Sequence, residues 1–134
     1  MYYAFDQYLW VDPCNPKRGW GLFGQAGLAD GNPNPIRWSY SVGVGGSSPL
    51  RCRAKDTFGA GYYFVSLSDD FKNLLNGPVL GPVLGQRNEQ GVEFFYNYAL
   101  TPYCRLTPDL QVISPSTERF KTAVVPGVRL KIDF

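Results

Sequence analysis

The chain has 134 residues, of which 16% are aromatic, and its 15 glycines and 11 prolines are spread over the whole length. Lysine and arginine number 13 against 11 acidic residues, and a scattered net charge of +2 does not suit a nucleic-acid-binding protein. No apolar run approaches the roughly 18 to 20 residues of a spanning helix, and the first ten residues lack the regions of a secretory signal. We therefore expect no helical membrane protein, and a mature piece or fragment if the protein is exported.

Seven segments have the residue pattern of β-strands separated by turn residues. The first three are 2–11, 20–28 and 36–44, joined by turns at 12–19 and 29–35. In residues 36–44, apolar side chains alternate cleanly with arginine, serine and glycine. The fourth segment, 57–67, is interrupted by glycine, and its facing is ambiguous because two sets compete: Phe58, Tyr62 and Phe64 against Tyr63, Val65 and Leu67.

The longest connection is 68–90. Ser68 or Asp69 stands before an apolar spacing at Phe71, Leu74 and Leu75, which predicts a short helical turn with an N-cap. The remainder contains a duplicated Pro-Val-Leu-Gly and is predicted to be an irregular loop.

The last three strands are predicted at 91–100, 104–113 and about 122–134. The turn at 101–103 makes the first two a hairpin. The final residues, GVRLKIDF, alternate apolar and charged side chains, so this strand has one apolar and one charged face.

Two folds fit such alternation, a soluble β-sandwich and a membrane barrel. The polar faces are mild for a fully exposed surface, and aromatic residues stand near strand ends, as in the girdles of outer-membrane barrels. These residues are Trp20, Trp38, Phe94, Tyr96, Tyr98 and Phe134. We predict an all-β fold, an antiparallel transmembrane β-barrel of the outer membrane. Because seven such strands cannot close a bacterial barrel, we expect residues 1–134 to be one domain, part of a larger barrel.

The connections fall into two sets. With the C-terminal Phe134 at the periplasmic end, 12–19, 45–56 and 101–103 face the periplasm, and 29–35, 68–90 and 114–121 face outside. The long 68–90 loop is the natural candidate for folding over or into a pore.

Several stretches resemble the C-terminal portion of the carbohydrate-selective porin family (OprB type): DQYLWVDPCNPKRGWGLFGQAG, DTFGAGYYFVSLSDDFKN, EQGVEFFYNYALTPYCRLTPDLQVISPS and GVRLKIDF. The resemblance covers nearly the whole chain. It implies a 16-stranded barrel in the outer membrane through which sugars diffuse passively. We expect sugars as solutes, outer-membrane lipid around the barrel and the barrel-assembly machinery at the Phe134 strand as partners, with no cofactor and no nucleic acid; a homo-oligomer stays open.

The predicted pore-lining residues share the polar parity of their strands and offer planar or charged hydrogen-bonding groups to sugar hydroxyls. Arg105 and Arg129 stand out, because arginine holds its donors in a rigid fork and Glu93 and Asp109 could orient them. The alternative for each is a solvated wall residue or a cross-strand ion pair. The full set is Arg37, Arg105, Arg129, Lys131, Glu93, Asp109, Asp133, Gln111 and Asn97. Stacking of sugars on Tyr8 or Trp10 is a weaker alternative.

Other function classes fit less well. A hydrolase or acyltransferase would need a base, and the chain has no histidine. A non-conducting anchor would need a plugged interior, whereas Ser39, Ser41, Gly43 and Thr107 leave space. The three cysteines, Cys14, Cys52 and Cys104, are expected to be incidental, and without histidine or a Cys-x-x-Cys spacing we expect no metal site.

Overall fold

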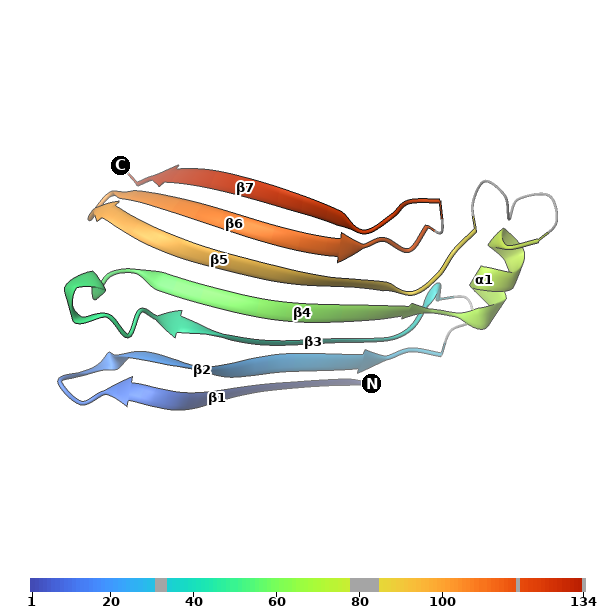
Figure 1. The fold of residues 1–134 in the computed structure, drawn as a ribbon. Helices are drawn as coiled ribbons and strands as arrows, with labels where there is room; N and C mark the ends of the chain where they lie inside the picture. The colour runs from blue at the N-terminus through green and yellow to red at the C-terminus, as the bar shows by residue number, and fades with distance from the viewer. Residues whose placement is uncertain (31–33, 78–84, 118, 134) are drawn as a thin grey trace.

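The structure, a computed structural model, describes residues 1–134 except 31–33, 78–84, 118 and 134. Its described strands form one antiparallel sheet in which each strand pairs with its neighbour in the sequence (Figure 1). In chain order the elements are β1 (Tyr2–Asp12), β2 (Asn15–Leu28), β3 (Ile36–Ser47), the 3₁₀ turn η1 (Arg51–Arg53), β4 (Thr57–Leu67), α1 (Asp69–Leu75), β5 (Glu89–Thr101), β6 (Cys104–Ser114) and β7 (Ala123–Ile132).

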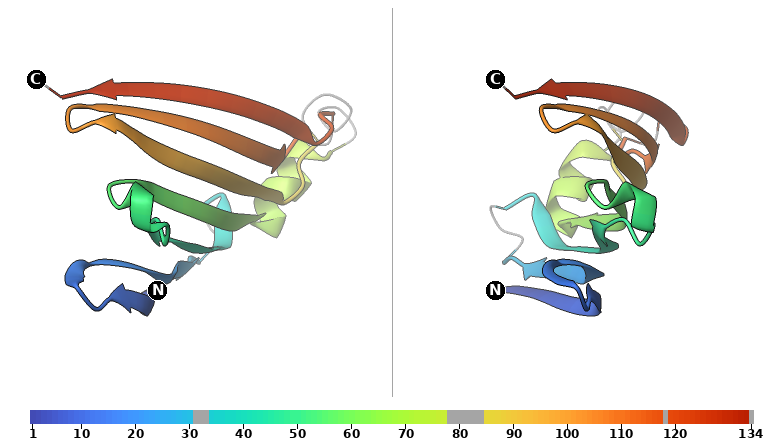
Figure 2. Two further views of the ribbon diagram at one scale, coloured as in Figure 1. Left: turned by 60° about the vertical axis from the view of Figure 1, so that its left-hand side comes forward. Right: turned by 90° about the vertical axis from the view of Figure 1, so that its left-hand side faces the viewer.

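The sheet is a single curved layer, and no second layer covers either face in the described part of the chain (Figure 2). Among the described residues Leu67 is the one buried hydrophobic side chain, while large apolar residues such as Phe94 and Leu130 are 51% and 57% exposed. A soluble sandwich would bury such residues between two sheets. The described helical segments are also too short or too polar to cross a membrane.

The strand register separates the side chains into two faces. On what we call the polar face, Gly61, Glu93 and Gln111 are cross-strand neighbours, and on the apolar face Ala60, Phe94 and Leu110 are. This register resolves the ambiguous fourth strand. Tyr63 pairs with Gly91 and so lies on the polar face, whereas Tyr62 pairs with Val92 on the apolar face.

Aromatic rings on the apolar face gather toward both ends of the strands. Trp38 lies 5.0 Å from Phe64 and 5.6 Å from Tyr40 between ring centroids, near the end of β4 that leads into α1. Toward the opposite end Trp20 lies 6.5 Å from Phe58 and Tyr96 6.2 Å from Tyr98. Phe94, expected at a strand end, lies in mid-strand opposite Ala60 and Leu110, and Phe134 is outside the described residues.

The predicted turn at 12–19 is wrong in extent, because β2 begins at Asn15. The Asp12 carboxylate accepts a hydrogen bond from the backbone N–H of Cys14 at 2.9 Å and pairs with Arg18 at 2.6 Å. These contacts close a turn of only Pro13 and Cys14. Residues 15–19, which were predicted to belong to the turn, are therefore part of β2. The other predicted strands agree with the structure to within three residues at each described end.

One end of the sheet, which we call the turn end, carries the connections 13–14, 48–56 and 102–103. The Asp56 carboxylate, 2% exposed, accepts hydrogen bonds from the Tyr96 hydroxyl and the Ala99 N–H, both at 2.9 Å, and pairs with Arg53 at 3.1 Å. Arg53 in turn lies 3.4 Å from the ring centroid of Tyr98. The 48–56 connection is thereby fastened to β5.

Candidate functional site

The predicted pore-lining residues of β5, β6 and β7 all share the polar face. Thr107 pairs with Arg129 and Arg105 with Lys131, so the two arginines are diagonal neighbours on adjacent strands. Glu93 pairs with Gln111, and Asn97 pairs with Thr57 of β4. The predicted residues of these three strands thus form one continuous surface, with the cations gathered toward the turn end and Glu93, Gln111 and Asp109 nearer mid-strand.

The expected orientation of Arg105 and Arg129 by Glu93 and Asp109 is wrong. Among the described residues none of these four makes an ion pair with another, and the Asp109 carboxylate instead accepts from Gln111 Nε2 at 3.4 Å. It also lies against Gly127, where an added Cβ would collide with it. Register explains the difference, since Asp109 is opposite Gly127 and Phe95 rather than an arginine.

Two buried polar atoms on this face have no hydrogen-bond partner among the described residues. They are Asn97 Oδ1 and Arg105 Nε. Lys131 and Asp133, by contrast, are an exposed pair at 2.8 Å, with side chains 64% and 48% exposed. That pair joins two residues of one segment rather than two strands, and its exposure fits the solvated wall residues considered as the plainer role.

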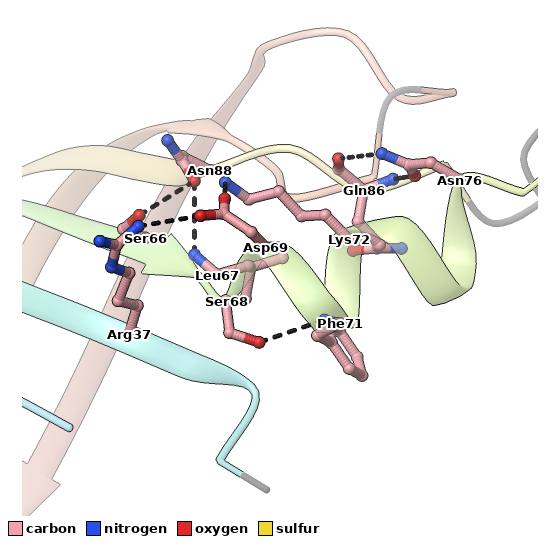
Figure 3. A network of polar contacts seen from close by, with 10 residues as sticks. All are labelled: Arg37, Ser66, Leu67, Ser68, Asp69, Phe71, Lys72, Asn76, Gln86 and Asn88. Carbon is pink, nitrogen blue, oxygen red and sulfur yellow. Dashed lines mark hydrogen bonds and ion pairs between the residues drawn. The ribbon is translucent and has the colours of Figure 1, made fainter. Parts of the chain in front are cut away.

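Arg37 is separated from the other predicted residues. A register shift between Ile36 and Trp38 makes it the extra residue of a bulge, and its guanidinium pairs with Asp69 of α1 at 2.9 Å (Figure 3). Both side chains are more than half exposed, at 59% and 66%. Arg37 therefore lies at the opposite end from Arg105, where it contacts the helix that follows β4.

The connection after β4 begins with a helix, as predicted, and its described part beyond α1 has side-chain contacts that the predicted irregular loop did not include. The predicted N-cap is confirmed, because Ser68 Oγ accepts from the Phe71 N–H at 3.2 Å at the start of α1 (Figure 3). Beyond α1, Asn76 and Gln86 exchange two hydrogen bonds, at 3.1 and 2.6 Å. We call this end, with 68–88 and 115–122, the loop end. Whether the loop enters a pore stays a prediction, and residues 78–84 lie outside the described part.

Aromatic rings that cover glycines lie on the polar face over β2 to β5, and Gly43, expected to leave space, is among the covered glycines. Phe23 lies across Gly43, Phe95 across Gly59 and Tyr63 across Gly91, each so close that an added Cβ would collide with the ring. The sequence signal is a glycine opposite an aromatic residue on the neighbouring strand, which is visible only once the register is known.

A shallow pocket of about 180 Å³ lies among these rings. Phe23 of β2, Tyr63 of β4 and Phe95 of β5 surround it, together with Ser41 and Glu93, while Gly61 contributes to its lining without a side chain. The Tyr63 hydroxyl donates to Glu89 Oε1 at 3.0 Å, which fixes the position of its ring. The pocket brings the predicted residue Glu93 together with three rings that sequence reasoning did not place at the site.

The described residues contain no group of three or more histidine, cysteine, aspartate or glutamate side chains placed to hold a metal ion.

A family comparison decides the class of protein. The model for the carbohydrate-selective porins of the OprB family matches residues 1–134, the full length given. The chain belongs to this family. A search of curated proteins found no match.

A solved structure has the same fold. The chain is similar to a high-pH structure of Pseudomonas putida OprB, with 24% identity and a TM-score of 0.86. The match covers 99% of this chain but 34% of that one, so the porin chain described here spans about a third of the length of the structure it matches. The seven strands thus adopt the fold of part of an OprB barrel, which confirms the predicted fold class and the resemblance.

Proposed function

We propose that this porin chain forms part of a passive sugar channel in the outer membrane, as the C-terminal part of a barrel of about 16 strands. The observation that carries the proposal is the family match over residues 1–134. The single-layer sheet supports it, because one face is apolar and exposed while the other carries the charged side chains of β5 to β7. In this arrangement the apolar face contacts lipid and the polar face lines water.

The wall would act on sugars through hydrogen bonds rather than through net charge. Arg105, Arg129 and Gln111 offer donors, and Glu93 and Asp109 offer acceptors, along one path on the polar face. A neutral sugar exchanges its water hydrogen bonds for these, one contact at a time, and leaves again because no single contact is strong. Arg37 and Asp133 would contribute at the two ends of the path, and Asn97 and Lys131 near the turn end.

The same proposal places the turn end in the periplasm and the loop end outside, with the strand ending at Phe134 recognised by the barrel-assembly machinery. It assigns a channel rather than an enzyme. A non-conducting anchor is not favoured, since Gly61 leaves a hollow between the rings of the polar face. Homo-oligomers would need an additional interface on the apolar face.

Liposome swelling tests this function. The protein, purified in its complete membrane-assembled form, should admit glucose faster than an anionic solute of similar size. Equal rates for the two solutes would reject sugar preference, and absence of swelling with either would favour the anchor. Single-channel steps in a planar bilayer provide the independent check on conduction.

A further inference from the structure

We propose that the pocket between Phe23, Tyr63 and Phe95 is a stacking subsite for the pyranose ring of a passing neutral sugar. The proposal deepens the sugar-channel function and rests on it. It differs from the hydrogen-bonding path of β5 to β7, because its main surface is aromatic and it lies over β2 to β5.

The rings are held in place by the sheet and remain open toward the polar face. Phe23 is 44% exposed and Phe95 37% exposed, although each covers a glycine of the neighbouring strand. Leaving aromatic surface exposed on the side of a sheet that faces water costs free energy, and open apolar patches of this kind commonly mark binding sites. The glycines allow the rings to lie low against the backbone, which creates the hollow.

The lining is complementary to both kinds of surface that a sugar ring presents, its apolar C–H face and its hydroxyl groups. The C–H face of a pyranose packs on aromatic rings, while its hydroxyls require hydrogen-bonding groups at the edge. Ser41 and Glu93 provide that edge. Glu93 makes no hydrogen bond or ion pair with any described residue, so its oxygens are available to accept from sugar hydroxyls.

Size and charge restrict the occupant. The hollow of about 180 Å³ is smaller than the roughly 300 to 1,000 Å³ of pockets for drug-sized ligands, so it suits one ring rather than an oligosaccharide or a polypeptide segment. The Glu93 carboxylate disfavours anions at the same place. A neutral monosaccharide unit is therefore the ligand that the pocket fits.

Gly61 allows the pocket to be filled without moving its rings. A Cβ added there would lie 3.8 Å from the Val42 carbonyl oxygen, an ordinary contact, whereas one added at Gly43 would displace Phe23. Gly61→Val therefore obstructs the pocket, and Phe95→Ala removes a ring. Gly27→Val is the matched control, because Gly27 lies on the same face outside the pocket and its added Cβ would be 3.6 Å from Ser39 Oγ.

The experiment measures the glucose concentration that half-saturates the channel, from glucose-dependent changes of ion current in planar bilayers, with the complete assembled porin. Loss of stacking is expected to raise this half-saturating glucose concentration about fivefold in Gly61→Val and in Phe95→Ala, and not in Gly27→Val. The half-saturating concentration of sorbitol, an open-chain polyol without a ring face, should change less than twofold in the same variants. Folded-barrel yield, read by heat-modifiable gel mobility, should equal that of the wild type.

Three results would overturn the subsite. These are an unchanged glucose response in both pocket variants, an equal change for glucose and sorbitol, or a folded yield that falls in both, which would mean that the rings pack against another part of the porin. If the wild type itself shows no glucose saturation and admits anions equally well, the sugar-channel function fails instead, so the two failures are distinguishable.

Discussion

The two ends of the sheet are stabilised in different ways. At the turn end, one buried carboxylate, Asp56, forms an ion pair with Arg53 of η1 and accepts two hydrogen bonds from β5. At the loop end, the contacts around α1 are individually weaker and more exposed, as in the Arg37–Asp69 pair. The 48–56 connection at the turn end therefore depends on one interaction centre, whereas the loop end distributes its stability over several contacts. Substitutions should therefore have large effects at the first end and graded effects at the second.

The largest effect is expected from Asp56→Ala. Removing this carboxylate leaves Arg53 without its ion-pair partner, the Ala99 N–H without an acceptor and Tyr96 with only the 3.5 Å contact to Ser48 Oγ, so the free energy of unfolding should fall by about 3 to 5 kcal/mol. Urea unfolding of the porin in lipid vesicles, followed by tryptophan fluorescence, measures it. Asp6→Ala is the control, since the exposed Asp6 side chain makes no ion pair or hydrogen bond with any described residue. Equal losses in the two variants would remove the distinction between the ends.

Arg87→Ala should have an intermediate effect at the loop end. Arg87 Nε donates to the Pro115 carbonyl at 2.9 Å and its Nη2 to the Phe120 carbonyl at 3.0 Å, which joins the segment before β5 to the one before β7. Loss of both hydrogen bonds should lower the free energy of local opening of these two segments by about 1.5 kcal/mol. The population of the locally opened state then rises roughly tenfold. Proteinase K cleavage near 85–88 and 115–120 reports the change. Arg119→Ala, which removes an exposed arginine, should leave the cleavage rate at the wild-type value.

Ser68→Ala should cost about 1 kcal/mol, the usual loss when a helix N-cap is removed. The hydroxyl accepts a hydrogen bond from the Phe71 N–H at the first turn of α1. Ser68→Thr retains the acceptor and should recover most of the loss in the same urea experiment. If the threonine variant unfolds as easily as the alanine variant, packing around this 4% exposed residue, rather than capping, determines the effect.

The smallest effect is expected from Arg37→Ala. An ion pair whose side chains are 59% and 66% exposed should contribute less than about 1 kcal/mol, and high salt should abolish the contribution. Urea unfolding at low and high salt separates this contribution from packing. A loss above that range that persists in salt would mean that α1 depends on Arg37 as strongly as the turn end depends on Asp56.

Local alternation sufficed to predict most strands and the faces of the last three. The range 57–67 agrees with β4 at both ends, and Arg105, Arg129 and Lys131 share one face as expected. What failed depended on partners distant in the sequence. The extension of β2 to Asn15 needs the Asp12–Arg18 pair, and the position of Arg37 needs the bulge in β3. Likewise, Phe95 reads as an interruption of its strand pattern until Gly59 is known to lie opposite.

Cys14 and Cys52 occupy two different connections at the same end of the strands, and both thiols are free and exposed. Cys104, at the start of β6, is less accessible. Labelling of these two thiols can therefore report the orientation of the barrel in the membrane. A bulky polymer-linked maleimide, too large to pass a channel, should leave both thiols unmodified on intact cells and tag them once the envelope is permeabilised, which fixes the sidedness of every strand at once.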